Sequence, residues 1–227
     1  MLAGLGLGSL TIGILALSIG SSFNGAVTTF MTHAYGQKEY RQCQVYRNKA
    51  MFLSLVLYCI LLIPIFFIGD IYAAIGQDPE IAAYAIQYVK YTIPFIIFNY
   101  ISQIYAAFAI SQEVAWYGLI SMIVGTVTHA IMICIFFLWL DMGYQGVILA
   151  TGLMFAFRAS INVGMVELRN DLRKHSDVHL FSKETVTNLG PLFYKSLSSM
   201  SLGVWGWWSF DIFTLMATYI GPAAAGG

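Results

Sequence analysis

Charged side chains are scarce in this sequence. Asp, Glu, Lys and Arg make up 10% of the residues, apolar residues make up 59%, and the mean hydropathy is +0.74. A soluble domain usually carries about 25% charged residues, so too few are present here to solvate a globular surface. The formal net charge is zero, which gives no indication of a nucleic-acid partner. These absences exclude an ordinary soluble protein and point to the membrane.

Motifs of soluble chemistry are missing as well. The sequence contains no Walker phosphate loop, no Rossmann glycine fingerprint, no HExxH, no GxSxG and no paired CxxC. Its three cysteines, Cys43, Cys59 and Cys134, are far apart and match no metal spacing, so we interpret them as packing residues. We therefore predict no enzyme activity, no metal and no bound cofactor. An ATP-driven pump would need a nucleotide site, so transport driven by an ion gradient remains.

Long apolar runs are what the sequence has in abundance. A run of about 18 apolar residues is long enough to cross a bilayer as a helix. Six runs predict an all-α, multi-pass membrane protein, a polytopic helical bundle in the plasma membrane or an internal organelle membrane. They cover residues 2–32, 51–68, 82–110, 116–140, 147–168 and 189–220. The first run is rich in Gly and Ser, and small residues such as Gly4 and Gly8 let helices approach closely.

The connections between the runs differ in charge. One side carries the cations of the first and fifth connections: Lys38, Arg41, Arg47, Lys49, Arg169, Arg173, Lys174 and Lys183. The other side carries four acids and one cation: Asp70, Asp78, Glu80, Asp141 and Lys90. Cytoplasmic connections have an excess of Lys and Arg. The basic side is therefore predicted to be cytoplasmic, with both ends of the chain outside.

Asp211 is the only carboxylate in the apolar run 189–220. An Asp at the centre of a bilayer costs about 2.5–3.5 kcal/mol on insertion scales, so such a residue usually serves an ion, a proton or a cationic solute. The alternative is that Asp211 hydrogen-bonds a neighbouring helix or lies near the outer surface. Trp207 and Trp208 stand about one turn before it, and indole faces beside an anion form a cage for an organic cation. Anchoring at the membrane interface explains these tryptophans equally well.

Further polar side chains inside the runs are Asn99, Gln103, His129 and Arg158. Asn99 and Gln103 share a helix face, where they either bond across helices or line a cavity. His129 is either a packed neutral imidazole or a proton carrier, since histidine titrates near physiological pH. Arg158 stands half-way along its run and needs a carboxylate partner or an aqueous cavity. Asp211 is the acid available, so we hypothesise an Arg158–Asp211 pair, which a double-mutant cycle would test.

Four segments stand in order along nearly the whole chain. They are HAYGQKEYRQCQVYRNKAM at 33–51, GQDPEIAAYAIQYVKYTIP at 76–94, MGYQGVILA at 142–150 and WGWWSFDIF at 205–213. Gln103 stands nine residues after Pro94, and Gln112 nine residues after Gln103. Together these features resemble the multidrug and toxic compound extrusion (MATE) transporters of the eukaryotic branch, in which a histidine also stands at the position of His129.

The resemblance implies a fold and an activity. Members of the family have twelve helices in two lobes around a central cavity, and they export organic cations or amphipathic compounds in exchange for H⁺ or Na⁺. This chain resembles helices two to seven. Residues 1–168 would supply five helices of the N-terminal lobe without its first helix, 169–188 a cytoplasmic linker, and 189–227 the truncated first helix of the second lobe. The implied partners are a small, cationic organic substrate, the lipid bilayer and the missing helices of the full-length chain.

The resemblance also points to site residues. WGWWSFDIF resembles the family segment EWWSFE, so Asp211 matches its second acid, whereas Gly206 replaces its first. Thr28 stands where the family often has an acid. We predict that Asp211 binds the cation or proton and that Trp207, Trp208, Asn99, Gln103 and His129 line the cavity. The alternatives are a flippase of related fold for lipid-linked substrates and a truncated copy that is inactive alone.

Overall fold

The computed structural model describes residues 2–169, 178, 180 and 182–220, and these residues form helices and short connections without a strand. Three consecutive elements make the first long helix: α1 (Leu2–Ile12), the π-helical η1 (Gly13–Leu17) and α2 (Ser18–Gly36). The others are α3 (Tyr40–Phe66), α4 (Ile68–Ala74), α5 (Pro79–Ser111), α6 (Trp116–Ile133), η2 (Cys134–Trp139), α7 (Gly143–Glu167), α8 (Lys183–Val186) and α9 (Gly190–Ile220).

Local sequence signals set several helix ends. Asp78 caps α5, because its Oδ1 atom accepts hydrogen bonds from the Glu80 and Ile81 amides at 2.9 and 3.2 Å, and Pro79 occupies the first turn. One boundary is a correction to the sequence prediction. The helix expected over 51–68 begins at Tyr40, so residues 40–50 are helical rather than a connection. Their polar side chains conceal this start, because hydropathy detects only the apolar part of a helix.

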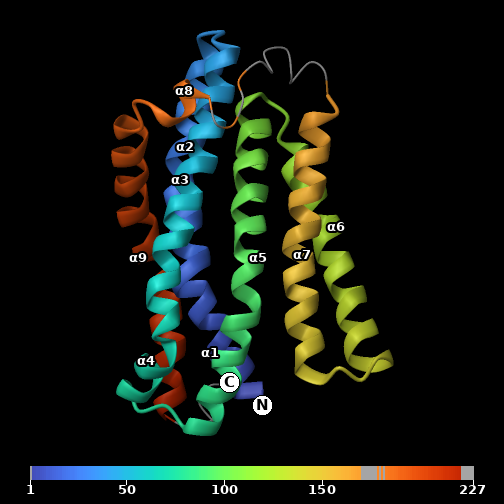
Figure 1. The fold of residues 1–227 in the computed structure, drawn as a ribbon. Coiled ribbons are helices and arrows are strands. Elements are labelled where there is room, and N and C mark those ends of the chain that lie inside the picture. The colour runs from blue at the N-terminus through green and yellow to red at the C-terminus, as the bar shows by residue number, and fades with distance from the viewer. Residues whose placement is uncertain (1, 170–177, 179, 181, 221–227) are drawn as a thin grey trace.

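The helices form an elongated bundle with α5 near its centre (Figure 1). In this view α5 runs between α3 and α7, whereas α9 and α6 lie at opposite edges. The long α1–η1–α2 helix packs on α5, and α9 packs against α2 and η1. Because α9 is covered on this one side within the described chain, much of its remaining surface is exposed, including Phe210 and Phe213.

Five helices in the described part of the chain are long and apolar enough to cross a membrane: Leu2–Gly36, Tyr40–Phe66, Pro79–Ser111, Trp116–Trp139 and Gly143–Glu167. They confirm the polytopic helical class. The expected sixth span corresponds to α9, which has 31 residues but is not among these five. Lys195, Asp211 and a series of serines lower its hydropathy, and its crossing of the membrane stays a prediction.

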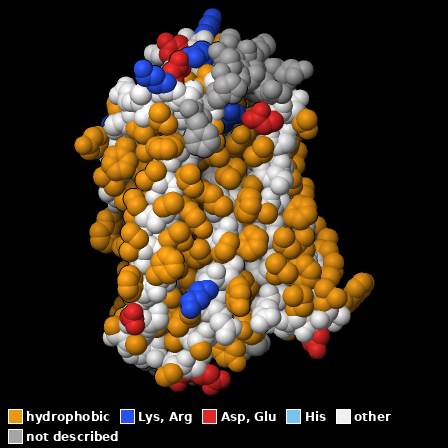
Figure 2. Space-filling view, viewed as in Figure 1, with side chains coloured by type: hydrophobic (Ala, Val, Ile, Leu, Met, Phe, Trp, Pro, Cys, Tyr) orange, Lys and Arg blue, Asp and Glu red, His pale blue; other side chains and the backbone are white. Residues whose placement is uncertain are grey.

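Charge separates the two ends of the bundle. Figure 2 shows Lys and Arg gathered, with some acids, at the end that carries α8, whereas acids and one basic side chain lie toward the opposite end. A broad apolar belt covers the face between them. The described basic residues of the first and fifth connections therefore lie at one end of the bundle, whereas Arg173 and Lys174 lie outside the described residues. Which end faces the cytoplasm stays a prediction.

Small residues allow the closest helix contacts. A Cβ atom added to Gly20 of α2 would enter the Tyr100 ring of α5 and lie 2.8 Å from the Tyr100 oxygen. That hydroxyl donates a hydrogen bond to the Ala16 carbonyl at 2.8 Å. At the other interface, a Cβ atom on Gly203 of α9 would lie 2.8 Å from the Ser22 Cβ of α2. The close approach expected along the first helix (α1–η1–α2, called the Gly-rich helix below) is therefore confirmed at these positions.

A polar cluster joins three helices near the basic end. Arg47 of α3 contacts Glu167 of α7, with Nη1 to Oε1 at 3.2 Å, and the Tyr105 hydroxyl of α5 donates to the same oxygen at 3.1 Å. The Arg47 guanidinium also lies over the rings of Tyr105 and Phe108, at 5.0 and 4.9 Å from their centres. Side-chain exposure is 12% for Arg47 and 38% for Glu167, so Arg47 is shielded and Glu167 is partly open to solvent.

The residues that precede α9 are attached to α3. Arg41 makes a two-pronged contact with Glu184 of α8, at 2.6 and 3.0 Å. Asn48 donates to the Val178 carbonyl at 3.0 Å, and Lys49 donates to the Asn188 carbonyl at 3.2 Å. The described part of the predicted linker, 169–188, is therefore docked on the helices before it.

Candidate functional site

A cavity of about 570 Å³ opens between the Gly-rich helix, α5, α7 and α9. Its wall is made by Gly6, Ser9, Leu10, Gly13, Leu17, Ser18, Ser21, Asn99, Gln103, Phe155, Arg158, Trp207 and Asp211. Five of these residues were singled out from the sequence: Asn99, Gln103, Arg158, Trp207 and Asp211. Helices far apart in the chain thus bring most of the candidate polar groups to one space.

Asp211 faces the Gly-rich helix. One of its carboxylate oxygens lies 4.0 Å from the position that a Cβ atom on Gly13 would occupy. Gly13 begins the π-helical turn η1, and such turns occur frequently at functional sites. Trp207 lies one turn before Asp211 on the same face of α9 and lines the same cavity, although 60% of its surface is exposed. An anion and one indole ring therefore share the wall.

Trp208 has a different environment from the one expected. Its Nε1 atom donates to the Ile14 carbonyl and to the Ser18 Oγ atom, both at 3.2 Å. Its ring packs edge-on against Trp205, with 6.3 Å between ring centres. It is absent from the cavity wall, so the two-tryptophan cage is not formed in the described chain. Trp208 instead joins α9 to the Gly-rich helix.

Replacing Trp208 with phenylalanine is expected to loosen this contact. The change removes the indole donor and keeps an aromatic ring, so the loss should be about 1 kcal/mol in the free energy of unfolding, the usual net value of a hydrogen bond. Thermal unfolding in detergent micelles measures it. Trp205→Phe is the matched control, since Trp205 is 69% exposed and makes no such bond to another described residue. Equal destabilisation by both changes would contradict this role.

The amides of α5 behave differently from one another. Gln103 donates from Nε2 to the Ser21 Oγ atom at 3.0 Å, which links α5 to α2 across the cavity wall. Asn99 is 6% exposed, and within the described chain its amide makes no hydrogen bond. Because Asn99 makes no such bond and borders the cavity, its amide can both donate to and accept from a molecule bound there.

His129 lies away from this cavity. Its Nε2 atom is 3.2 Å from the Thr151 Oγ1 atom of α7, and Thr151 donates its own proton to the Val147 carbonyl at 2.9 Å. With the Thr151 proton directed to the Val147 carbonyl, the hydroxyl oxygen accepts from His129 Nε2. The contact joins α6 to α7. The placement differs from the predicted position on the cavity wall and agrees with the packing alternative for this residue.

Arg158 reaches the cavity through a gap at Gly125. A Cβ atom on Gly125 of α6 would overlap the Cγ and Cδ atoms of Arg158, so the glycine makes room for the side chain. Both Arg158 and Asp211 lie in the described chain and line one cavity, yet no ion pair within 4.0 Å joins them. The structure thus brings the two charges together without the direct contact that we hypothesised, and their coupling stays a prediction.

The sequence reading missed the small residues of the wall. Gly6, Ser9, Gly13 and Ser21, with Leu17 between the last two, recur every three or four positions and form one stripe of the Gly-rich helix. The periodicity could have predicted a shared face, but close helix packing explains such a stripe equally well. Among the described residues, no group of three or more His, Cys, Asp and Glu is placed to hold a metal ion.

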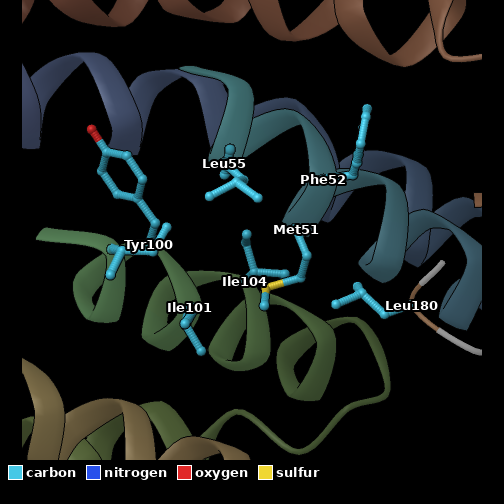
Figure 3. A pocket seen from close by; sticks show the side chains of 9 residues that line it. Met51, Phe52, Leu55, Tyr100, Ile101, Ile104 and Leu180 are labelled. Atoms are coloured by element: carbon cyan, nitrogen blue, oxygen red, sulfur yellow. The ribbon is translucent and has the colours of Figure 1, made fainter. Parts of the chain in front are cut away.

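Two other cavities differ in character. One of about 160 Å³ lies between α3 and α5 (Figure 3). Its polar residues, Ser54 and Tyr100, donate instead to Asn24 and to the Ala16 carbonyl, so it offers hydrocarbon contacts alone. The other, of about 600 Å³ between α2 and α9, includes His33, Glu39 and Lys195. We place the candidate site at the Asp211 cavity, because it unites Asp211 and Arg158, charged side chains of the apolar runs 189–220 and 147–168.

Comparisons with known proteins show what the chain resembles. Residues 1–135 match the model of the MatE family. Protein DETOXIFICATION 1 of Arabidopsis thaliana is 26% identical over 215 residues, which cover 94% of this chain and 44% of that protein. The eukaryotic MATE transporter AtDTX14 has a TM-score of 0.88 and 20% identity, covering 98% of this chain and 49% of that chain.

A second solved structure is an inward-facing multidrug resistance MATE family transporter of the MOP superfamily. It has a TM-score of 0.76 and 17% identity, and the match covers 95% of this chain and 50% of that chain. At these identities the structural likeness establishes the fold. The chain spans half or slightly less of the length of each of these relatives.

Proposed function

The chain belongs to the MatE family, and from that premise we propose that it forms part of a secondary active antiporter. The complete protein would export organic cations or amphipathic compounds in exchange for H⁺ or Na⁺ by alternating access. The names of its relatives, a detoxification protein and a multidrug resistance transporter, support export of small organic compounds. The absence of a nucleotide-binding motif from this sequence agrees with an ion gradient as the driving force.

The observation that carries the proposal is the shared cavity of Asp211, Trp207 and Asn99. A carboxylate and an indole ring attract a cationic group by charge and by the cation–π interaction. Asn99 adds an amide that has no partner in the described chain. These groups lie on α9 and α5, which are different helices. A change in the packing of α9 would therefore alter the site.

Asp211 would couple the ion to the substrate. With its carboxylate ionised it attracts a cation, and protonation or occupation by Na⁺ removes that attraction. The carboxylate borders the Gly13 backbone, so a change in its charge acts directly on the contact between α9 and the Gly-rich helix. Repacking of this contact would release the substrate and reorient the cavity.

Replacing Asp211 with asparagine tests the proposal in the complete protein. Asp211→Asn keeps the size of the side chain and removes its charge, so ion-driven efflux should fall at least about tenfold, the factor that 1.4 kcal/mol represents. Uptake of a fluorescent organic cation into inverted vesicles, driven by an imposed H⁺ or Na⁺ gradient, measures the change. Asp141→Asn is the matched control, because Asp141 lies in the connection before α7. Efflux that Asp211→Asn leaves intact would eliminate this role.

A further inference from the structure

The Asp211 cavity contains two opposite charges that do not neutralise each other by contact. Arg158 lines it from α7 and Asp211 from α9, and no ion pair within 4.0 Å joins these described side chains. An arginine keeps its charge at any physiological pH, so an ionised Asp211 makes the net charge of the pair zero. A simple organic cation in this cavity would be attracted by Asp211 and repelled by Arg158.

Arg158 is built into the wall rather than resting on a surface. Its stem passes through the space that Gly125 leaves free. Its Nε atom is buried and has no hydrogen-bond partner among the described residues. Arg158 as a whole is partly buried. A guanidinium forms its most favourable hydrogen bonds with a planar anion such as a carboxylate. The arrangement therefore leaves a place for an anionic group.

The remaining wall suits the rest of such a molecule. Asp211 and Trp207, four apart on α9, offer a negative charge and an indole ring to a cationic group. Phe155, Leu10 and Leu17 provide apolar surface. The unengaged Asn99 amide adds a donor and an acceptor. Within one cavity, the basic group lies on α7, the acidic and indole groups lie on α9, and the apolar side chains come from α1, η1 and α7.

We propose that this cavity selects zwitterionic amphipathic solutes. Their anionic group contacts Arg158, and their amine or quaternary ammonium group lies beside Asp211 and Trp207. The inference rests on the proposed transport function, whose substrate class it narrows: a solute that carries both charges satisfies both side chains, whereas a plain cation satisfies one. Binding of this kind is an equilibrium property and can be measured without any ion gradient.

A matched pair of probes tests the selection. 4-(Trimethylammonio)benzoate carries a quaternary ammonium, an aromatic ring and a carboxylate, and its methyl ester lacks the anion alone. Isothermal titration of the purified complete protein in detergent should show the zwitterion binding at least about tenfold more tightly than the ester, the factor that 1.4 kcal/mol represents. Equal affinity, tighter binding of the ester, or no binding of either probe would overturn the proposal.

Variants show whether Arg158 causes the preference. Arg158→Gln should remove the difference between the two probes, and Arg158→Lys should retain part of it, because lysine keeps the charge but not the planar fork. Gly125→Ala should also reduce the difference by displacing the Arg158 stem. Gly118→Ala on the same helix is the control, since a Cβ atom there makes an ordinary 3.7 Å contact. A zwitterion preference unchanged in Arg158→Gln would overturn the role of Arg158.

Failure of the transport function would look different. Vesicles containing the complete protein could show no ion-driven flux of either probe while the titration still showed the zwitterion preference. That result would remove the antiporter function and leave the binding selectivity in place. Flux of the ester with no flux of the zwitterion, in contrast, would keep the antiporter and overturn the proposed substrate class.

Discussion

Replacing Gly20 with valine is expected to destabilise the bundle by about 3 kcal/mol or more in the free energy of unfolding. Even one added carbon would enter the buried ring of Tyr100, so α2 and α5 would have to separate. Overpacking of this kind costs about 1–3 kcal/mol. Displacing the ring also removes the bond to the Ala16 carbonyl, and a buried hydroxyl without a partner costs about 1–3 kcal/mol more.

Thermal unfolding and size-exclusion profiles in detergent measure the effect. Gly36→Val, in the same helix, is the control, since nothing lies within 4 Å of a Cβ atom at Gly36. Its effect should stay within about 0.5 kcal/mol, as for other surface substitutions. If Gly20→Val melts together with the wild-type chain, then α2 and α5 do not pack as described.

Replacing Arg47 with methionine is expected to cost about 2 kcal/mol in the free energy of unfolding. Methionine keeps an apolar stem but loses the contact with Glu167 and the charge over Tyr105 and Phe108. Breaking a fully buried pair costs about 3–5 kcal/mol, but Glu167 is 38% exposed, so solvent screens part of this loss. The remainder is large because one side chain holds three helices.

Arg41→Met provides the comparison. Arg41 and Glu184 make a close pair, but their side chains are 47% and 50% exposed, and such a pair is worth about 0.2–1 kcal/mol. The two variants should therefore differ clearly in melting temperature. A double-mutant cycle of Arg47→Met with Glu167→Gln should measure a coupling free energy of about 1 kcal/mol between the two side chains. Equal melting of the Arg47→Met and Arg41→Met chains would contradict the shielded position of Arg47.

Hydropathy was sufficient to predict most of the long helices. Five of the apolar runs became candidate membrane spans, and the run expected over 82–110 became α5, which begins three residues earlier at Pro79. The start of α3 at Tyr40 was missed, because a helix that continues out of the apolar layer carries no hydropathy signal. The last run illustrates the opposite limit. It folds into the single helix α9, although polar residues lower its mean hydropathy.

The candidate site was predictable in composition but not in arrangement. Scarcity of charge pointed to Asp211 and Arg158, and the structure brings both to one cavity. Trp208 was expected on the same wall as Trp207, but neighbouring residues of a helix point about 100° apart, and Trp208 turns to the Ile14 carbonyl. His129 likewise points from α6 to Thr151 of α7 because of its angular position around α6. The rotation of one helix against another depends on packing, which a single sequence does not specify.

The docking of α8 on α3 limits how far α9 can travel. Residues 187–189 are all that separate the end of α8 from the start of α9. A fully extended chain covers at most about 3.6 Å per residue, so this short connection spans at most roughly 14 Å between the flanking residues. Lys49 donates a hydrogen bond to the Asn188 carbonyl and so attaches this connection to α3. While α8 stays docked, α9 can rotate about its first turn. The short connection prevents the start of α9 from separating from the helices before it.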